Sequence, residues 1–149
     1  MDTVYDNIAV IGGISVAPQS ISGSSAVDGT DVNTTGYASA ELYAYGAEAS
    51  GSPSAATLAV KLQESSDNST WTDAEDNTGT VIGFTLNVHT GAAENAARIE
   101  GLNLNRKQYL RAVVTPSFTS GTSPASLAFA QIVLGAAAQK PVDSNVSNT

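Results

Sequence analysis

Pairs of carboxylates are the residues of this sequence that most directly suggest chemistry, because two acids flanking a glycosidic bond can hydrolyse it. Glu75 and Asp76 are adjacent, and Asp67 and Asp73 lie a few positions before them. A catalytic acid needs burial to raise its pKa, yet the segments around these four residues are hydrophilic and typical of solvated turns. We therefore expect them to be loop residues, and we predict no catalytic residue and no enzymatic activity.

The single histidine, His89, follows a predicted strand and precedes Thr90-Gly91. A serine–histidine–aspartate site needs its serine on a strained G-x-S-x-G turn, and this motif does not occur in the chain. Cysteine is absent, which excludes metal sites built on thiolates. We predict no cofactor.

Calcium is the metal for which the sequence offers ligands, since hard cations bind oxygen atoms of Asp, Asn and main-chain carbonyls. Residues 28–33 read Asp-Gly-Thr-Asp-Val-Asn. The EF-hand spacing fails, because the sixth position from Asp28 is Asn33 rather than Gly and the twelfth is Ser39 rather than Glu. We predict no metal site and keep bound calcium as an open alternative.

Aromatic side chains suggest binding rather than catalysis. Tyr43 and Tyr45 are two positions apart in a predicted strand and therefore share one of its faces. Together with Trp71 they form a candidate platform on which sugars stack. The competing interpretation is that these rings pack a core or a subunit interface, where tyrosine is enriched because its hydroxyl can stay hydrated.

Period-two alternation indicates the elements that must position these residues. In residues 58–64, Leu58, Val60 and Leu62 share one face while Lys61 and Gln63 share the other. Both faces are apolar in residues 108–115, which predicts a central strand that Pro116 closes and in which Arg111 needs a partner. Including weaker candidates, we predict about seven strands, at residues 8–14, 37–45, 58–64, 82–88, 98–104, 108–115 and 126–134.

Turn-forming Gly, Pro, Asn, Asp and Ser clusters separate the strands, and no 12-residue window has an uninterrupted helical pattern. Residues 92–97 can form at most one helical turn. These patterns predict an all-β fold, a jelly-roll-like antiparallel β-sandwich with an extended N-terminal arm. We expect an arm and linker at residues 1–35, the sandwich at residues 36–138 and a flexible tail at residues 139–149.

The expected arm is apolar before it becomes rich in Ser and Gly, so it is a candidate to add a strand to a partner. Its proposed partner-binding residues are Val4, Tyr5, Ile8, Val10, Ile11, Ile14 and Val16.

Charge narrows the class of partner. The chain of 149 residues has 14 acidic and 6 basic residues and a formal net charge of −8, which repels a phosphate backbone. We expect no direct contact with nucleic acid. No apolar stretch approaches the about 20 residues of a membrane helix, and the first residues do not resemble a secretory signal. We expect no membrane partner and synthesis in a reducing cytoplasm.

Two stretches resemble a known class of proteins. Residues 62–73 read L-Q-E-S-S-D-N-S-T-W-T-D, which is similar to the L-Q-E-S-x-D-x-x-x-W-x-D strand–turn–strand of small β-sandwich structural proteins in tailed bacteriophages. The later K-Q-Y-L-R-A-V-V-T of residues 107–115 and F-A-Q-I-V-L-G of residues 129–135 extend the resemblance, which covers about half of the chain.

The resemblance implies a capsid decoration (cement) protein. Such a protein is made in the bacterial cytoplasm and binds the outer surface of the phage head, where it bridges subunits of the major capsid protein, often as a homotrimer. Two alternatives stay open: a tail or head–tail structural subunit, and a carbohydrate-binding β-sandwich module.

Overall fold

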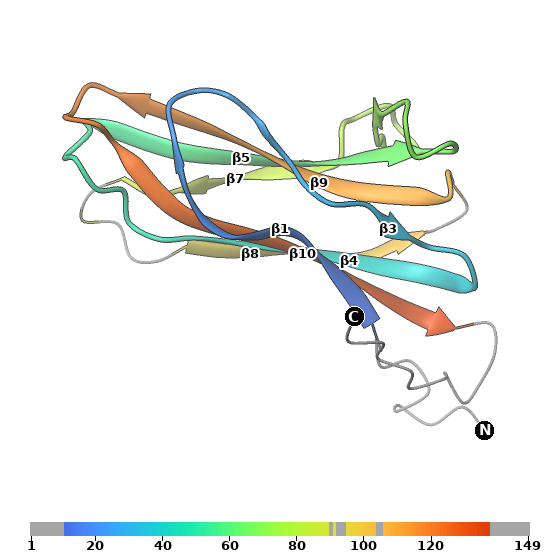
Figure 1. Ribbon diagram of the computed structural model, residues 1–149. Helices are drawn as coiled ribbons and strands as arrows, with labels where there is room; N and C mark the ends of the chain where they lie inside the picture. Colours follow the sequence, from blue (N-terminus) through green and yellow to red (C-terminus); the bar gives the residue numbers. More distant parts are fainter. Residues whose placement is uncertain (1–10, 90, 92–94, 104–105, 138–149) are drawn as a thin grey trace.

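The structure is a computed structural model that describes residues 11–89, 91, 95–103 and 106–137. These residues form ten strands and no helix. The strands are β1 (Ile11–Ser22), β2 (Val27–Asp28), β3 (Val32–Asn33), β4 (Tyr37–Gly46), β5 (Ala55–Ser65), β6 (Thr72–Asp73), β7 (Gly83–Asn87), β8 (Asn95–Asn103), β9 (Tyr109–Thr119) and β10 (Ala125–Ala137). Figure 1 shows two layers, with β5, β7 and β9 in one and β1, β4, β8 and β10 in the other.

The order of the strands identifies the fold. Sheet A has the order β1-β10-β4-β8, and sheet B has the order β2-β9-β5-β6 with β3 also beside β9 and β7 beside β5. Each of the pairs β2/β3 and β6/β7 therefore acts as one interrupted strand. Counted this way, eight strands run 1-8-3-6 in sheet A and 2-7-4-5 in sheet B, all paired antiparallel. This winding is the jelly-roll form of the β-sandwich, and the predicted fold class is confirmed.

Alternating side chains build the core between the sheets. Along β5 the inward residues Leu58, Val60 and Leu62 are almost fully buried, while Lys61 and Gln63 face outward as predicted. Sheet A contributes large inward residues such as Leu42 and Ile132 together with alanines such as Ala44 and Ala130. A Cβ atom at Gly46 of β4 would lie only 2.8 Å from the Leu58 side chain, so Leu58 of sheet B fills the space that this glycine leaves.

The segments predicted as strands from residue 37 onward fall in β4, β5, β7, β8, β9 and β10. Residues 95–97 of the candidate helical turn lie in β8 instead, and residues 92–94 lie outside the described residues. The two-residue strands β2, β3 and β6 were not predicted, because two residues have no measurable period.

Pro116 does not end its strand, contrary to the prediction, since β9 continues to Thr119. The backbone N–H of Ala112 donates to Ser15 Oγ, and its C=O accepts from the Gly29 N–H. The backbone hydrogen-bonding groups of even-numbered residues in β9 therefore point away from β5. Pro116 shares that direction, and the pairing of β2 with β9 begins only at Val114. Its missing N–H therefore removes no sheet hydrogen bond.

The predicted arm differs most from the structure. Residues 11–22 form β1, which pairs with β10 along the edge of sheet A, and residues 27–33 contribute to sheet B, so the sandwich begins well before residue 36. Val16 is buried in the core at 1% exposure and is not available to a partner, whereas Ile14 is 55% exposed. Ile11 lies in β1, and Val4, Tyr5, Ile8 and Val10 lie outside the described residues, as does the predicted tail.

A buried serine ties β1 to sheet B. The Ser15 hydroxyl accepts a hydrogen bond from the Ala112 N–H at 2.8 Å and donates one to the Thr30 carbonyl at 2.8 Å. The register between β1 and β10 shifts between Ile14 and Val16, which marks a bulge at this serine. The edge strand of sheet A is thereby fastened to sheet B.

Candidate functional site

The outer face of sheet B is polar, and its side chains are bonded to one another. Lys61 and Gln63 of β5 both reach Asp73 of β6, with the Lys61 Nζ–Asp73 Oδ1 distance at 2.7 Å and the Gln63 Nε2–Asp73 Oδ1 distance at 2.8 Å. Arg111 of β9 donates two hydrogen bonds to Gln63 Oε1, at 2.9 and 2.7 Å, and pairs with Asp28 Oδ2 at 3.1 Å. Arg111 thus finds its partners in a row of bonded side chains that crosses β2, β9, β5 and β6.

Trp71 covers this row. The Arg111 guanidinium carbon lies 4.5 Å from the centre of the Trp71 ring, a cation–π contact. Tyr43 and Tyr45 belong to β4 of sheet A, on the other layer of the sandwich. The three aromatic residues therefore do not form the single stacking platform that the sequence suggested.

The outer face of sheet A has the opposite character. Its apolar and aromatic residues alternate with buried neighbours and point away from the core. Two of them, Ile14 at 55% and Leu127 at 48%, are among the most exposed large hydrophobic residues. We name the set the sheet-A face: Ile14 of β1, Tyr43 and Tyr45 of β4, and Leu127, Phe129 and Val133 of β10.

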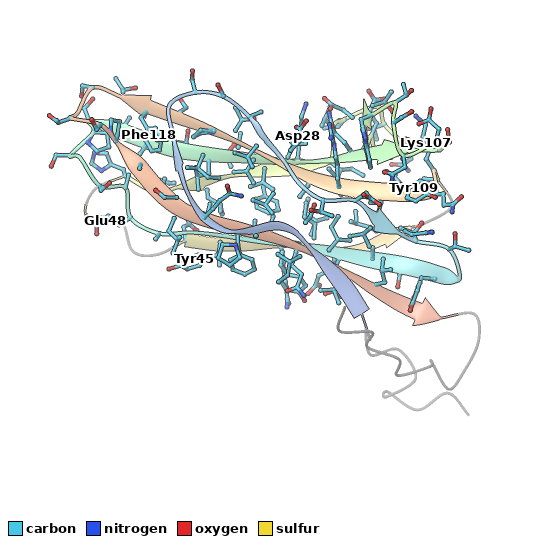
Figure 2. The ribbon with its side chains drawn as sticks, in the orientation of Figure 1. Asp28, Tyr45, Glu48, Lys107, Tyr109 and Phe118 are labelled. Carbon is cyan, nitrogen blue, oxygen red and sulfur yellow. The ribbon has the colours of Figure 1, made fainter. Side chains whose placement is uncertain are left out.

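Strand register makes the sheet-A face continuous. Phe129 lies directly opposite Tyr45, with ring centres 6.1 Å apart, and Figure 2 shows Tyr45 on the side of its layer that faces away from the other sheet. Gln131 is opposite both Tyr43 and Ile14, which places these two on either side of it. The prediction that Tyr43 and Tyr45 share a face is confirmed.

Charged side chains border this surface, since Glu41 lies opposite Val133 and Arg98 lies opposite Tyr43. Glu41 accepts a hydrogen bond from the Tyr43 hydroxyl, which raises the pKa of Tyr43, and Arg98 pairs with Glu100 on the neighbouring β8. With β4 at 10 residues, sheet A spans about 33 Å along its strands and about 19 Å across them. That area, about 600 Å², is on the scale of the 800 Å² or so that each partner buries in a stable interface.

The carboxylates considered for acid catalysis have pKa values shifted in the opposite direction. Backbone N–H groups of Thr70 and Ser69 hold the pKa of Asp67 far below its usual range. Hydrogen bonds from Thr78 and Thr80 lower the pKa of Asp76. Lys61 and Gln63 likewise lower that of Asp73. Asp67 and Asp76 are ionised acceptors that shape their loops, as expected of turn residues, whereas Asp73 belongs to strand β6 and not to a loop as predicted.

The remaining candidates are separate from one another. His89 follows β7, and its backbone N–H donates to Asn87 Oδ1. In the calcium candidate, Asp28 pairs with Arg111 and Asn33 Oδ1 accepts from the Thr35 N–H. Among the residues that the structure describes, no three His, Cys, Asp or Glu side chains gather as metal ligands would.

Sequence reasoning missed Leu127, Phe129 and Val133 as surface residues. The sequence did show that these three residues share one side of a strand, because they are spaced by even numbers of positions. Alternation alone, however, does not say which side of a strand is buried.

Comparisons with known proteins add no relative: no protein-family model matches the chain, and no curated protein gives a significant match. Within the described part of the chain, no helix has the length and apolar character needed to cross a membrane.

Proposed function

We propose that this chain is a structural virion protein, a capsid decoration protein that binds the outer surface of a phage head and stabilises it by bridging major capsid subunits. The observation that carries the proposal is the contrast between the two outer faces of the sandwich. The polar side chains of sheet B bond to one another, whereas the sheet-A face exposes apolar and aromatic groups, with Ile14 and Leu127 about half exposed. Contiguous apolar surfaces of this kind mark sites of association.

Two further arguments support the proposal. Jelly rolls occur in viral capsid and lectin domains, which is an analogy at the level of the fold. The resemblance of residues 62–73 and 107–135 to phage structural proteins points in the same direction. The described carboxylates with shifted pKa values, Asp67, Asp73 and Asp76, all have their pKa lowered, which is opposite to what a general acid needs.

We assign the contact with the major capsid protein to the sheet-A face rather than to an arm, because Val16 is buried while Ile14 and Leu127 are exposed. The protein then resides on the virion surface. A homotrimer, as in the proteins that the chain resembles, is the oligomer we propose, and light scattering on the purified protein measures it.

Binding to purified heads tests the assignment. We expect Leu127→Glu to weaken binding at least about tenfold, because a carboxylate would be buried against the shell without a partner. Val81→Glu is the matched control, since Val81 is also exposed, at 40%, but lies beside Glu75, outside the sheet-A face. Cosedimentation with heads lacking the protein measures both affinities.

Mass spectrometry of purified virions tests the class. We expect a fixed ratio to the major capsid protein. A chain found only in tails or connectors identifies the head–tail alternative, and a chain absent from particles refutes a virion role. If Leu127→Glu saturates heads like the unchanged protein, the sheet-A face is not the contact.

A further inference from the structure

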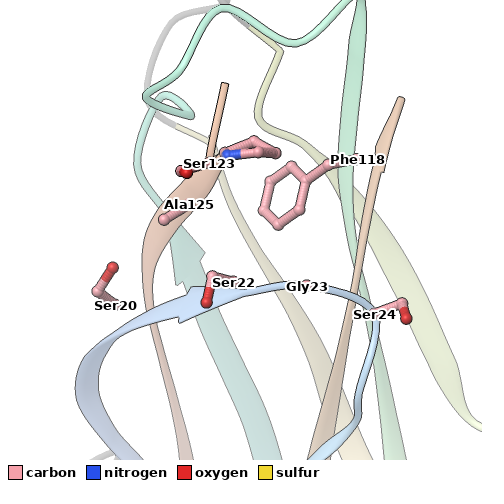
Figure 3. A pocket seen from close by; sticks show the side chains of 8 residues that line it. Ser20, Ser22, Gly23, Ser24, Phe118, Ser123 and Ala125 are labelled. Carbon is pink, nitrogen blue, oxygen red and sulfur yellow. The ribbon is translucent and has the colours of Figure 1, made fainter. Parts of the chain in front are cut away.

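A pocket opens at the end of the sandwich where β1 stops and β10 starts. Its volume is about 670 Å³, within the range of small-molecule sites. Figure 3 shows the Phe118 ring turned toward the turn that follows β1. The lining is Ser20, Ser22, Gly23, Ser24, Phe118, Ser123, Pro124 and Ala125.

The polar groups of this lining are uncharged hydroxyls. Four serines contribute hydroxyls, and no side-chain hydrogen bond to a described residue engages any of Ser20, Ser22, Ser24 or Ser123. A hydroxyl both donates and accepts, so each can pair with another hydroxyl. No charged residue lines the pocket, so an ionic ligand would find no counter-charge there.

The wall formed by the loop between β9 and β10 is held in place by the loop after β4. The Thr122 N–H donates to the Gly51 carbonyl at 2.8 Å, and the Ser50 N–H donates to the Ala125 carbonyl at 2.8 Å. The loops approach so closely that a Cβ atom at Gly121, where φ is 94°, would lie 2.7 Å from the Gly51 oxygen. A wall fixed before binding lowers the entropic cost of binding.

We propose that this pocket binds a neutral pyranose sugar. One face of such a ring carries C–H groups that pack on the Phe118 ring, and its edge carries hydroxyls that pair with the serines. The lining shares no residue with the sheet-A face, although Ser20 lies opposite Leu127 at its border, so the pocket adds a binding activity to the proposed assembly role and does not depend on it.

Titration of the ¹⁵N-labelled full chain with methyl glucoside, methyl galactoside and methyl N-acetylglucosaminide tests the proposal by NMR. Concentrations up to about 50 mM saturate a site of millimolar affinity. We expect at least one glycoside to shift the amide signals of residues 20–24 and 123–125. Phe118→Leu should weaken that binding about three- to tenfold by removing the aromatic ring, and Ser22→Ala should weaken it without any risk to the core.

Matched controls are Phe84→Leu, which changes another half-buried phenylalanine on β7, and Ser117→Ala, which removes an exposed hydroxyl next to Phe118 on the other face of β9. Neither should change the affinity. The proposal is overturned if no glycoside shifts any amide, if the controls weaken binding as much as Phe118→Leu and Ser22→Ala do, or if the shifts map to Tyr43, Tyr45 and Phe129. That last result would move sugar binding to the sheet-A face and leave the pocket without a ligand.

Discussion

Replacing Ser15 with alanine removes the side chain that fastens β1 to sheet B. The variant leaves the Ala112 N–H without an acceptor, and Ala112 is 0% exposed. An unsatisfied buried donor costs about 1–3 kcal/mol, whereas the lost bond to Thr30, an exposed residue, is replaced by water. We therefore expect Ser15→Ala to lower the free energy of unfolding by about 2 kcal/mol.

Urea unfolding measures this loss, and its midpoint should fall by about 1 M. Hydrogen exchange gives a local readout, because the Ala112 amide should lose protection more than its neighbours on β9. Ser20→Ala is the control on the same strand, since Ser20 is exposed and should change stability by less than about 0.5 kcal/mol. An unchanged midpoint together with a still-protected Ala112 amide would refute the anchoring role of Ser15.

Two further predictions concern the polar outer face and the loops. Arg111→Ala should shift the fluorescence emission of Trp71, the single tryptophan, to longer wavelength, because the ring loses the guanidinium that covers it. The same variant should lower the free energy of unfolding by about 1 kcal/mol. Arg98→Ala on the other sheet is the control, and an unchanged Arg111→Ala spectrum would contradict the stacking. Hydrogen bonds lower the pKa of Asp67 in the folded chain, so as the pH falls the unfolded chain takes up this proton first. The stabilisation of the fold by ionised Asp67 is therefore complete above about pH 4, the usual pKa of an aspartate, and is lost as the pH falls further. Asp67→Asn should lower the melting temperature at pH 7 and make it fall less steeply with pH below pH 4. If the melting temperatures of Asp67→Asn and of the unchanged protein fall equally steeply below pH 4, the reasoning is wrong.

Strands with a clear period were predictable because alternation encodes burial on one side. Residues 58–64 are an example, since Leu58 and Leu62 are inside and Lys61 is outside in both the prediction and the structure. The apolar segment at the start of the chain was misjudged for a related reason. An edge strand paired within its own sandwich and an arm paired with a neighbour have the same pattern, and only the pairing of β1 with β10 distinguishes them.

The sequence by itself determined the all-β class, the main strands, the loop role of Asp67 and Asp76, and the shared side of Tyr43 and Tyr45. Tertiary structure alone decided which side of β10 is the inside. The small residues Ala128 and Ala130 face the core, while the larger Leu127 and Phe129 face outward. The same inner side also carries the large Ile132 and Leu134, so residue size does not mark the core side of β10, and packing against the facing sheet decides it. Periodicity records that two sides differ, but the facing sheet determines which of them remains exposed.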